Sequence, residues 1–298
     1  MTPAHQLTLN LSGRLVSLEK PLVMGIVNVT PDSFFAGSRI DGAKALRARL
    51  DTLVREGAVL ADLGAYSSRS GAEEVSPEEE RRRLRPALQI LRDEYPDLPV
   101  SVDTFRSDVA RMAVEEYGAS MINDISGGGL DPAMYRTMAE LQVPYILMHM
   151  KGDPKTMQQQ ASYSDVTLEV IDYFAQRVGQ LLELGVHDII LDPGFGFSKT
   201  TVQNYELLAQ LGSLVEAFTQ PLLVGVSRKS MIYRPLGITP EEALSGTTFV
   251  HALALERGAK ILRVHDVRPA VEAVQLYEEL RPFLRSDGAL HYQHLRPL

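Results

Sequence analysis

The chain has 298 residues, 45% of them hydrophobic and 23% charged, and its excess of Asp and Glu (38) over Lys and Arg (30) gives a formal net charge of −8. Apolar residues spread along the whole chain exclude a mostly disordered protein, and the acidic balance argues against binding to nucleic acid or to a membrane surface. Because the chain has no cysteine, disulfide frameworks, thiol nucleophiles and thiolate metal sites are excluded.

The first 20 residues are predicted to form a β-hairpin. Leucines alternate with polar residues from Leu7 to Leu11, Ser12-Gly13 suits a tight turn, and a second alternating run begins at Leu15. We expect this hairpin to cover the bottom of the core that follows. The segment lacks the pattern of a signal peptide, and no stretch reaches the roughly 18 apolar residues of a membrane helix, so we expect a cytoplasmic protein.

Eight short apolar runs follow, rich in Val, Ile and Leu, and each carries a polar residue at or near its end. They are apolar on both faces, which is typical of buried parallel strands. The runs lie at residues 21–28, 58–64, 98–103, 119–127, 143–150, 187–192, 221–229 and 259–266.

Helix signals lie between these runs. Ser76 and Thr239 are each followed by Pro-Glu-Glu, which suits an N-cap with proline in the first helical position. Helical periodicity covers residues 165–184, 201–218 and 243–257. Glycines stand where helices should end and strands begin, at residues 57, 118, 185 and 258.

Eight strands alternating with helices over about 250 residues predict an α/β fold, a (β/α)8 TIM barrel. We expect one domain over residues 1–298, with the hairpin at 1–20 and a C-terminal tail at 285–298. The alternative is an open doubly wound sheet. Such a sheet normally has a glycine-rich turn after its first strand, and here that turn begins Asn28-Val29-Thr30.

The active site of such a barrel lies at the carboxyl ends of its strands, so the polar residues there are the candidate site. For Asp62 a structural role as a buried acceptor for loop N–H groups is favoured. The other acids and amides suit the nitrogen-rich edge of a pterin or purine ring. The candidates are Asn28, Asp62, Asp103, Asn123, Asp124, His149, Asp192, Ser227, Lys229, Arg263 and His265.

Basic residues form a second group. Arg263 and His265 alternate along the last run and therefore project to the same side, where Arg69 and Lys229 could join them around a phosphate. Residues 194–200 lack the spacing of a nucleotide-binding P-loop, and the histidines lack zinc-ligand spacing. Mg²⁺ carried in by a diphosphate would need only one or two protein oxygens.

Seven strings resemble, in order, the motifs of the dihydropteroate synthase family. The resemblance runs from about Pro21 to about Leu284. It implies a homodimeric transferase of folate biosynthesis, a target of sulfonamides, that joins 6-hydroxymethyl-7,8-dihydropterin diphosphate to 4-aminobenzoate with Mg²⁺. The strings are MGIVNVTPDSF (24–34), SVDT (101–104), INDISG (122–127), MHMKG (148–152), DPGFGF (192–197), VSRKS (226–230) and RVHDV (263–267).

The resemblance also implies roles for individual residues. The pterin would be held by Asp103, Asn123, Met148, Asp192 and Lys229. The diphosphate would be held by Asn28, Ser68, Arg263 and His265, with Asn28 also on the metal. The aminobenzoate site would comprise Arg69, Ser70, Phe197, Ser227 and Lys229. Catalysis, by departure of diphosphate and then attack of the amine, would depend on Asp103, Lys229, Arg263 and His265.

The sequence departs from the family pattern in its second loop, where Ser70 replaces the usual proline, and in its first loop, where Ala36-Gly37-Ser38 replaces Asp-Gly-Gly. Two alternatives therefore stay open. A methyltransferase barrel that uses methyltetrahydrofolate would share the pterin acids but has no need of Arg263-x-His265. A non-catalytic pterin-binding protein would be consistent with the altered second loop.

Overall fold

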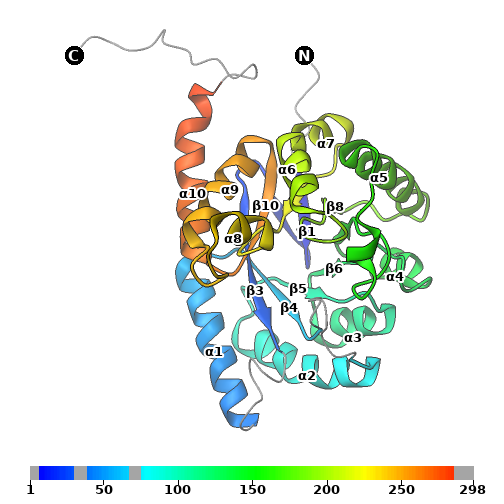
Figure 1. The fold of residues 1–298 in the computed structure, drawn as a ribbon. Helices are drawn as coiled ribbons and strands as arrows, with labels where there is room; N and C mark the ends of the chain where they lie inside the picture. The colour runs from blue at the N-terminus through cyan, green and yellow to red at the C-terminus, as the bar shows by residue number, and fades with distance from the viewer. Residues whose placement is uncertain (1–6, 30–38, 67–74, 285–298) are drawn as a thin grey trace.

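Eight parallel strands close into a barrel in the order β10-β3-β4-β5-β6-β7-β8-β9 (Figure 1). The structure, a computed structural model, describes residues 7–29, 39–66 and 75–284, without the side chains of residues 39–41. Pairing of β10 with β3 closes the sheet, which confirms the predicted barrel over the open sheet. The strands are β3 (Leu22–Asn28), β4 (Leu60–Gly64), β5 (Val100–Asp103), β6 (Met121–Asp124), β7 (Tyr145–Met148), β8 (Ile189–Asp192), β9 (Leu222–Val224) and β10 (Ala259–Val264).

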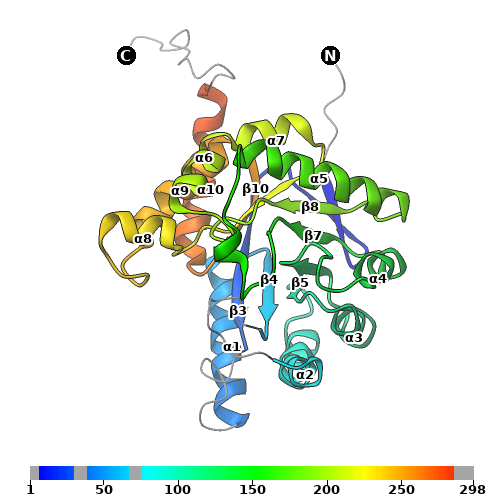
Figure 2. The same cartoon turned by 45° about the vertical axis from the view of Figure 1, so that its right-hand side comes forward.

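Helices surround the barrel (Figure 2). Their apolar faces form one continuous core with the outward faces of the strands. No helix in the described part of the chain has both the length and the apolar character needed to cross a bilayer. The helices are α1 (Arg39–Glu56), α2 (Pro77–Glu94), α3 (Ser107–Tyr117), α4 (Met134–Leu141), α5 (Val166–Glu183), α6 (Thr201–Ala209), α7 (Leu211–Ala217), α8 (Ser230–Leu236), α9 (Leu244–Glu256) and α10 (Val267–Leu280), with short 3-10 turns η2 (Met157–Gln160) and η3 (Arg281–Phe283).

The helix signals hold at most positions. Ser76 caps α2 by accepting a hydrogen bond from the backbone N–H of Glu79 over 3.2 Å. All four predicted terminal glycines have positive φ angles, between 75° and 97°. Two boundaries differ from the prediction: the helix expected over 201–218 breaks at Gln210, and the signal at Thr239 precedes a turn rather than α9.

The N-terminal hairpin closes the bottom of the barrel, as expected. It consists of β1 (Thr8–Leu11) and β2 (Arg14–Ser17), paired antiparallel. Leu9, Leu11 and Leu18 are almost fully buried and pack with residues at the amino ends of the barrel strands, such as Leu60 and Met121. These leucines exclude water from the amino end of the barrel interior.

The barrel interior changes from apolar to polar along its axis. Side chains alternate along a strand, so the residue two positions after each apolar floor residue also faces the interior. On β4 the sequence goes from Leu60 to Asp62, and on β10 from Ile261 to Arg263. The upper layer therefore contains, besides Ile26 of β3, the residues Asp62, Asn123, Met148, Asp192, Gly225 and Arg263, with Asp103 just above it.

Candidate active site

An arginine joins two acids across the carboxyl end of the barrel. Nε of Arg263 donates to Oδ2 of Asp62 over 2.6 Å, and Nη2 donates to Oδ2 of Asp103 over 2.8 Å. Nδ2 of Asn123 donates to the same oxygen of Asp62 over 3.1 Å. These residues come from β10, β4, β5 and β6. One network therefore links two predicted pterin residues, Asp103 and Asn123, to a predicted diphosphate residue, Arg263.

A third acid, Asp192, faces this network from the other side of the interior. Oδ1 of Asp192 accepts a hydrogen bond from the backbone N–H of Gly194 over 2.8 Å. A Cβ atom placed on Gly225 would lie 4.0 Å from Oδ2 of Asp192 and 3.8 Å from Cβ of Arg263. Gly225 thus leaves room for the side chains of Asp192 and Arg263 to face the same space.

Burial moves the pKa values of Asp103, Asp192 and nearby Lys229 toward neutral pH. It raises the pKa of Asp103 to about 7 against the opposing effect of Arg263. It also raises the pKa of Asp192, against the effect of Lys229, and lowers the pKa of Lys229 to about 8. Such shifts come from desolvation of charged forms and are common where proteins bind or transform ligands.

Lys229 connects this pocket to an aromatic side chain. Its ammonium donates to the backbone carbonyl of Phe195 and lies 4.7 Å from the centroid of the Phe197 ring. Met148, almost fully buried, belongs to a small apolar cluster against which Phe197 packs. The pocket therefore combines hydrogen-bonding acids with one apolar, aromatic wall, an arrangement suited to a flat polar ring.

Ser227 and His265 meet beside Arg263. The backbone N–H of His265 donates to Oγ of Ser227 over 3.2 Å, and ring atom Nδ1 lies 3.2 Å from the same oxygen. Arg49 of α1, which sequence reasoning missed, donates to the backbone carbonyls of His265 and Ile26 over 2.8 and 3.0 Å. Burial and nearby Arg263 lower the pKa of His265 to about 4, so its imidazole is neutral at pH 7 and can donate one hydrogen bond.

Asn28 ends β3 with an exposed side chain next to the acid network. A Cβ atom on Gly64 would lie 3.8 Å from Oδ1 of Asn28 and 3.7 Å from Oδ2 of Asp103, so both oxygens border the gap that this glycine leaves. Within the residues that the structure describes, no group of three or more acidic, histidine or cysteine side chains could hold a metal ion.

Two of the candidate residues, Asp124 and Asp62, have contacts within the protein that indicate a structural role. Asp124 accepts from the hydroxyl of Tyr145 and from the backbone N–H groups of Ser126 and Gly128, at 2.7, 2.7 and 2.8 Å, so it shapes the following loop. Asp62 is a buried acceptor, as favoured, but for Arg263 and Asn123 rather than for loop N–H groups.

His149 and three residues of the second loop complete the list of candidates. His149 lies buried beneath a loop and contacts Lys199, a residue that no sequence signal singles out beyond its place after the GFGFS string. The proposed Ser68, Arg69 and Ser70 contacts lie outside the described residues.

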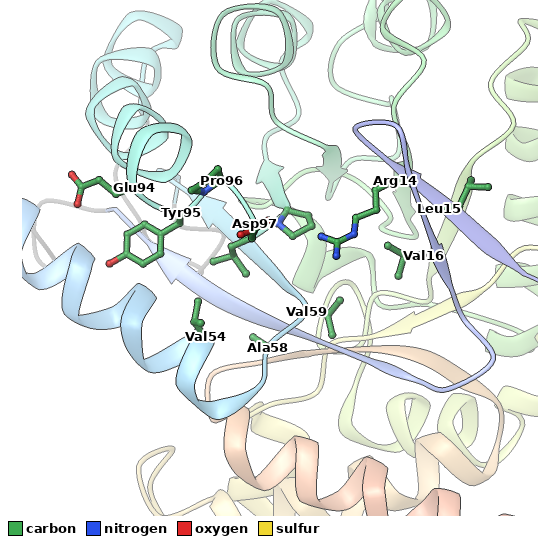
Figure 3. Close-up of a pocket in the computed structure, with 12 residues that line it drawn as sticks. Arg14, Leu15, Val16, Val54, Ala58, Val59, Glu94, Tyr95, Pro96 and Asp97 are labelled. Atoms are coloured by element: carbon green, nitrogen blue, oxygen red, sulfur yellow. The ribbon is translucent and has the colours of Figure 1, made fainter.

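A cavity of about 610 Å³ lies at the opposite end of the barrel (Figure 3). It is bordered by the N-terminal hairpin at Arg14–Val16 and by the connections before β4 and β5, including Val59 and Asp97. None of the strand-end candidates lines it. The cavity is therefore separate from the polar pocket at the carboxyl ends of the strands.

Comparison with known proteins places this chain in a family. The sequence model of the family described as "Pterin binding enzyme" matches residues 24–265. The chain is 42% identical over 272 residues to dihydropteroate synthase of Escherichia coli K12, covering 89% of this chain and 94% of that protein.

Solved structures agree with the sequence comparison. The chain is similar to Xanthomonas albilineans dihydropteroate synthase with 4-aminobenzoic acid, with a TM-score of 0.85, 40% identity and coverage of 93% of this chain and 98% of the other. It is also similar to Yersinia pestis dihydropteroate synthase in complex with a sulfonamide drug, with a TM-score of 0.85, 38% identity and coverage of 93% and 100%.

Proposed function

The chain belongs to the dihydropteroate synthases of the pterin-binding enzyme family, and from this premise we propose how its pocket is divided among the substrates. It is a transferase that joins 6-hydroxymethyl-7,8-dihydropterin diphosphate to 4-aminobenzoate, giving 7,8-dihydropteroate and diphosphate. The observation that carries this function is the network in which Arg263 joins Asp62 and Asp103, opposite Asp192, at the open end of the barrel. The methyltransferase alternative is set aside because the relatives are synthases.

The pterin subsite comprises the acids and amide inside the barrel together with Lys229 and Met148. Carboxylate oxygens of Asp103 and Asp192 can accept from ring N–H and amino groups, while Asn123 supplies both a donor and an acceptor. These polar atoms lie in a region of low dielectric constant, where a correctly paired ring gains most from each hydrogen bond. Met148 supplies the apolar face on which the ring would pack.

The diphosphate subsite lies on the side of β3 and β10. Arg263 and the neutral imidazole of His265 would donate to phosphate oxygens, with Asn28 beside them and Ser68 as a further contact outside the described residues. The carboxamide Oδ1 of Asn28, exposed beside the gap at Gly64, fits a hard cation that takes most of its ligands from diphosphate and water. We assign Asn28 as the protein ligand of Mg²⁺, which when bound would neutralise charge on the diphosphate.

The aminobenzoate subsite lies between the loops that follow β8 and β9. The ring of Phe197 and the ammonium of Lys229 lie side by side there, and Ser227 adds a hydroxyl. Arg69 and Ser70 complete the proposed set from outside the described residues. Because a sulfonamide is bound by the Yersinia pestis relative, we expect sulfonamides to compete with aminobenzoate for this subsite.

The reaction proceeds by displacement of diphosphate. The bond between the exocyclic carbon of the pterin and the diphosphate oxygen breaks first, with Arg263 and His265 stabilising the charge on the leaving group. Carboxylate Asp103 stabilises the cationic carbon that results. The neutral amine of aminobenzoate then forms the new C–N bond and releases a proton, so no covalent enzyme intermediate is needed.

Five large apolar side chains are exposed on α9, α10 and the following turn, and they support assembly as a homodimer. Phe249 is 65% exposed and Leu276 is 71% exposed, and Leu253, Leu280 and Phe283 accompany them. Exposed apolar groups on neighbouring helices suit a partner surface. Sedimentation of the full chain tests the proposal, and a monomer at all concentrations would contradict it.

A two-substrate assay of diphosphate release, with and without Mg²⁺, tests the function. Release that needs both substrates and the metal supports the synthase, whereas binding of pterin without turnover would indicate the non-catalytic alternative. We further propose that residues 1–298 form one cytoplasmic domain. Limited proteolysis and cell fractionation test that part.

A further inference from the structure

The loop between β8 and α6, residues 193–200, is held by side chains that bind its backbone carbonyls one after another. Nζ of Lys199 donates to the carbonyls of Gly194 and Phe197 over 3.1 and 3.2 Å. Between them, the carbonyl of Phe195 accepts from Lys229, and that of Gly196 accepts from Gln158. Four consecutive carbonyls of the loop that carries Phe197 are thus bound by Lys199, Lys229 and Gln158.

The terminal nitrogen of Lys199 has three polar partners within hydrogen-bond distance. The side chain is almost fully buried, and its third partner is Nδ1 of His149 at 2.9 Å. Three acceptors equal the three N–H groups of a protonated lysine, and no carboxylate is among its hydrogen-bond partners in the described part of the chain. Burial lowers the pKa of Lys199 to about 7. The same three contacts also fit the neutral amine when Nδ1 of His149 carries the hydrogen, so Lys199 joins His149 to the loop carbonyls in either protonation state.

His149 provides a fixed point for this interaction. Its backbone N–H donates to the carbonyl of Asp192 over 2.9 Å, and its ring meets the Tyr173 ring nearly edge-on with centroids 4.8 Å apart. Gly194 has a φ of +69°, and a Cβ atom there would lie 2.0 Å from the carbonyl oxygen of His149. Only glycine therefore allows the loop to lie this close to the end of β7.

We propose that Lys199 is a positioning residue, which ties the β8–α6 loop to His149 and thereby sets the place of Phe197 in the aminobenzoate subsite. This inference rests on the proposed function and assigns a task to a residue outside the reacting groups. Two of the pterin residues depend on it less. Asp103 and Asn123 project from barrel strands and have their own partners, whereas Phe197 is carried by the loop and packs beside Met148.

The substitution Lys199→Met tests the proposal, because methionine fills the space but donates no hydrogen bond. We expect the KM for aminobenzoate to rise about tenfold, as for loss of a charged hydrogen bond, and the KM for the pterin diphosphate to change less than about twofold. The matched control is Lys44→Met at an exposed position on α1, which should leave both values unchanged. Equal changes of both KM values in Lys199→Met would overturn the proposal.

A second pair of variants decides the question even where Lys199→Met fails to fold. Asn in place of His149 can present an acceptor where Nδ1 lies, whereas Leu cannot. We expect His149→Leu to raise the aminobenzoate KM and His149→Asn to restore most of the loss. Identical kinetics in the two variants would contradict a role through Lys199. An inactive wild-type enzyme would instead refute the proposed function.

Discussion

Arg263 and Asp62 form a hydrogen-bonded ion pair inside the barrel, with 2.6 Å between Nε and Oδ2 and no exposed surface on the aspartate side chain. The same carboxylate oxygen accepts from Asn123, so Asp62 holds a residue of the proposed diphosphate subsite and one of the proposed pterin subsite. Its other oxygen has no hydrogen-bond partner among the described residues. A fully buried acid therefore links the proposed diphosphate subsite to the proposed pterin subsite.

The first prediction concerns this coupling. Asp62→Asn should lower kcat/KM for the pterin diphosphate by about 10- to 150-fold, because a charged hydrogen bond to Arg263 is worth about 1.5–3 kcal/mol. Arg263→Ala should cause a loss of similar size, since it removes the donor to the diphosphate. Steady-state kinetics of both variants and of the double variant measure the effects.

In the double variant the losses should be clearly less than additive, because each single change disrupts the same pair. Fully additive losses would show that Asp62 acts independently of Arg263. The KM for aminobenzoate serves as the internal control and should change little.

Much of the fold could be predicted because its signals are local. Continuous apolar runs specify strands that are buried on both faces, and caps such as Ser76 specify where helices begin. The periodicity over 243–257 predicted the start of α9 near Leu244, but the cap signal at Thr239 was misleading, because Arg228 binds the carbonyls of Pro240 and Glu241, at 2.9 and 2.6 Å, and so keeps them out of the helix. The break at Gln210 is hidden by buried leucines on both sides, which continue one helical pattern.

The site was predictable to the extent that it follows from strand alternation. The rule that active sites lie at the carboxyl ends of barrel strands selects both Asn123 and Asp124, yet only Asn123 faces the interior, because neighbours on a strand point to opposite sides. The pair of His149 and Lys199 is separated by 50 residues, and only the fold brings it together. Its sequence spacing carries no signal.

The second prediction concerns the dependence of activity on pH. The pterin should bind to ionised Asp103, whose pKa is raised to about 7 by burial, and protonated Lys229, whose pKa is lowered to about 8. The profile of kcat/KM for the pterin diphosphate should therefore rise through pH 7 and fall above pH 8. Asp103→Asn should be much less active and should lose the acidic limb. An unchanged acidic limb in the variant would assign that limb to another group.

The third prediction concerns stability and follows from the same shift. The pKa of Asp103 rises from 3.8 to about 7 on folding. Between these values the folded state keeps a proton that the unfolded state releases, so the contribution of Asp103 to the free energy of unfolding falls as the pH rises. Asparagine does not titrate. Urea denaturation should therefore show Asp103→Asn gaining stability relative to the wild type from about pH 4 to about pH 7, and a constant difference would contradict the shift.

The fourth prediction concerns the metal. Asn28→Ala removes the proposed protein oxygen from Mg²⁺ while leaving the acid network of Arg263 intact. The Mg²⁺ concentration for half-maximal activity should rise about two- to tenfold, the range for one lost polar interaction of about 0.5–1.5 kcal/mol. Titration of activity with Mg²⁺ at saturating substrates measures it. An unchanged concentration would remove Asn28 from the metal site.

The last prediction separates recognition of the pterin ring from the chemistry that follows. Asp192→Asn keeps one oxygen, which can still accept from the N–H of Gly194, but turns the other acceptor into a donor that faces the ring. It also removes the carboxylate that raises the pKa of Lys229, so that the ammonium loses its proton more readily. Both effects act on the pterin, and we expect its dissociation constant, measured by calorimetry, to rise by about 10- to 150-fold for a loss of about 1.5–3 kcal/mol. The conservative change keeps the size of the side chain, so the melting temperature should stay close to that of the wild type. Normal affinity for the pterin in a well-folded variant would exclude Asp192 from ring recognition and would leave Asp103 and Asn123 as the residues that read the ring.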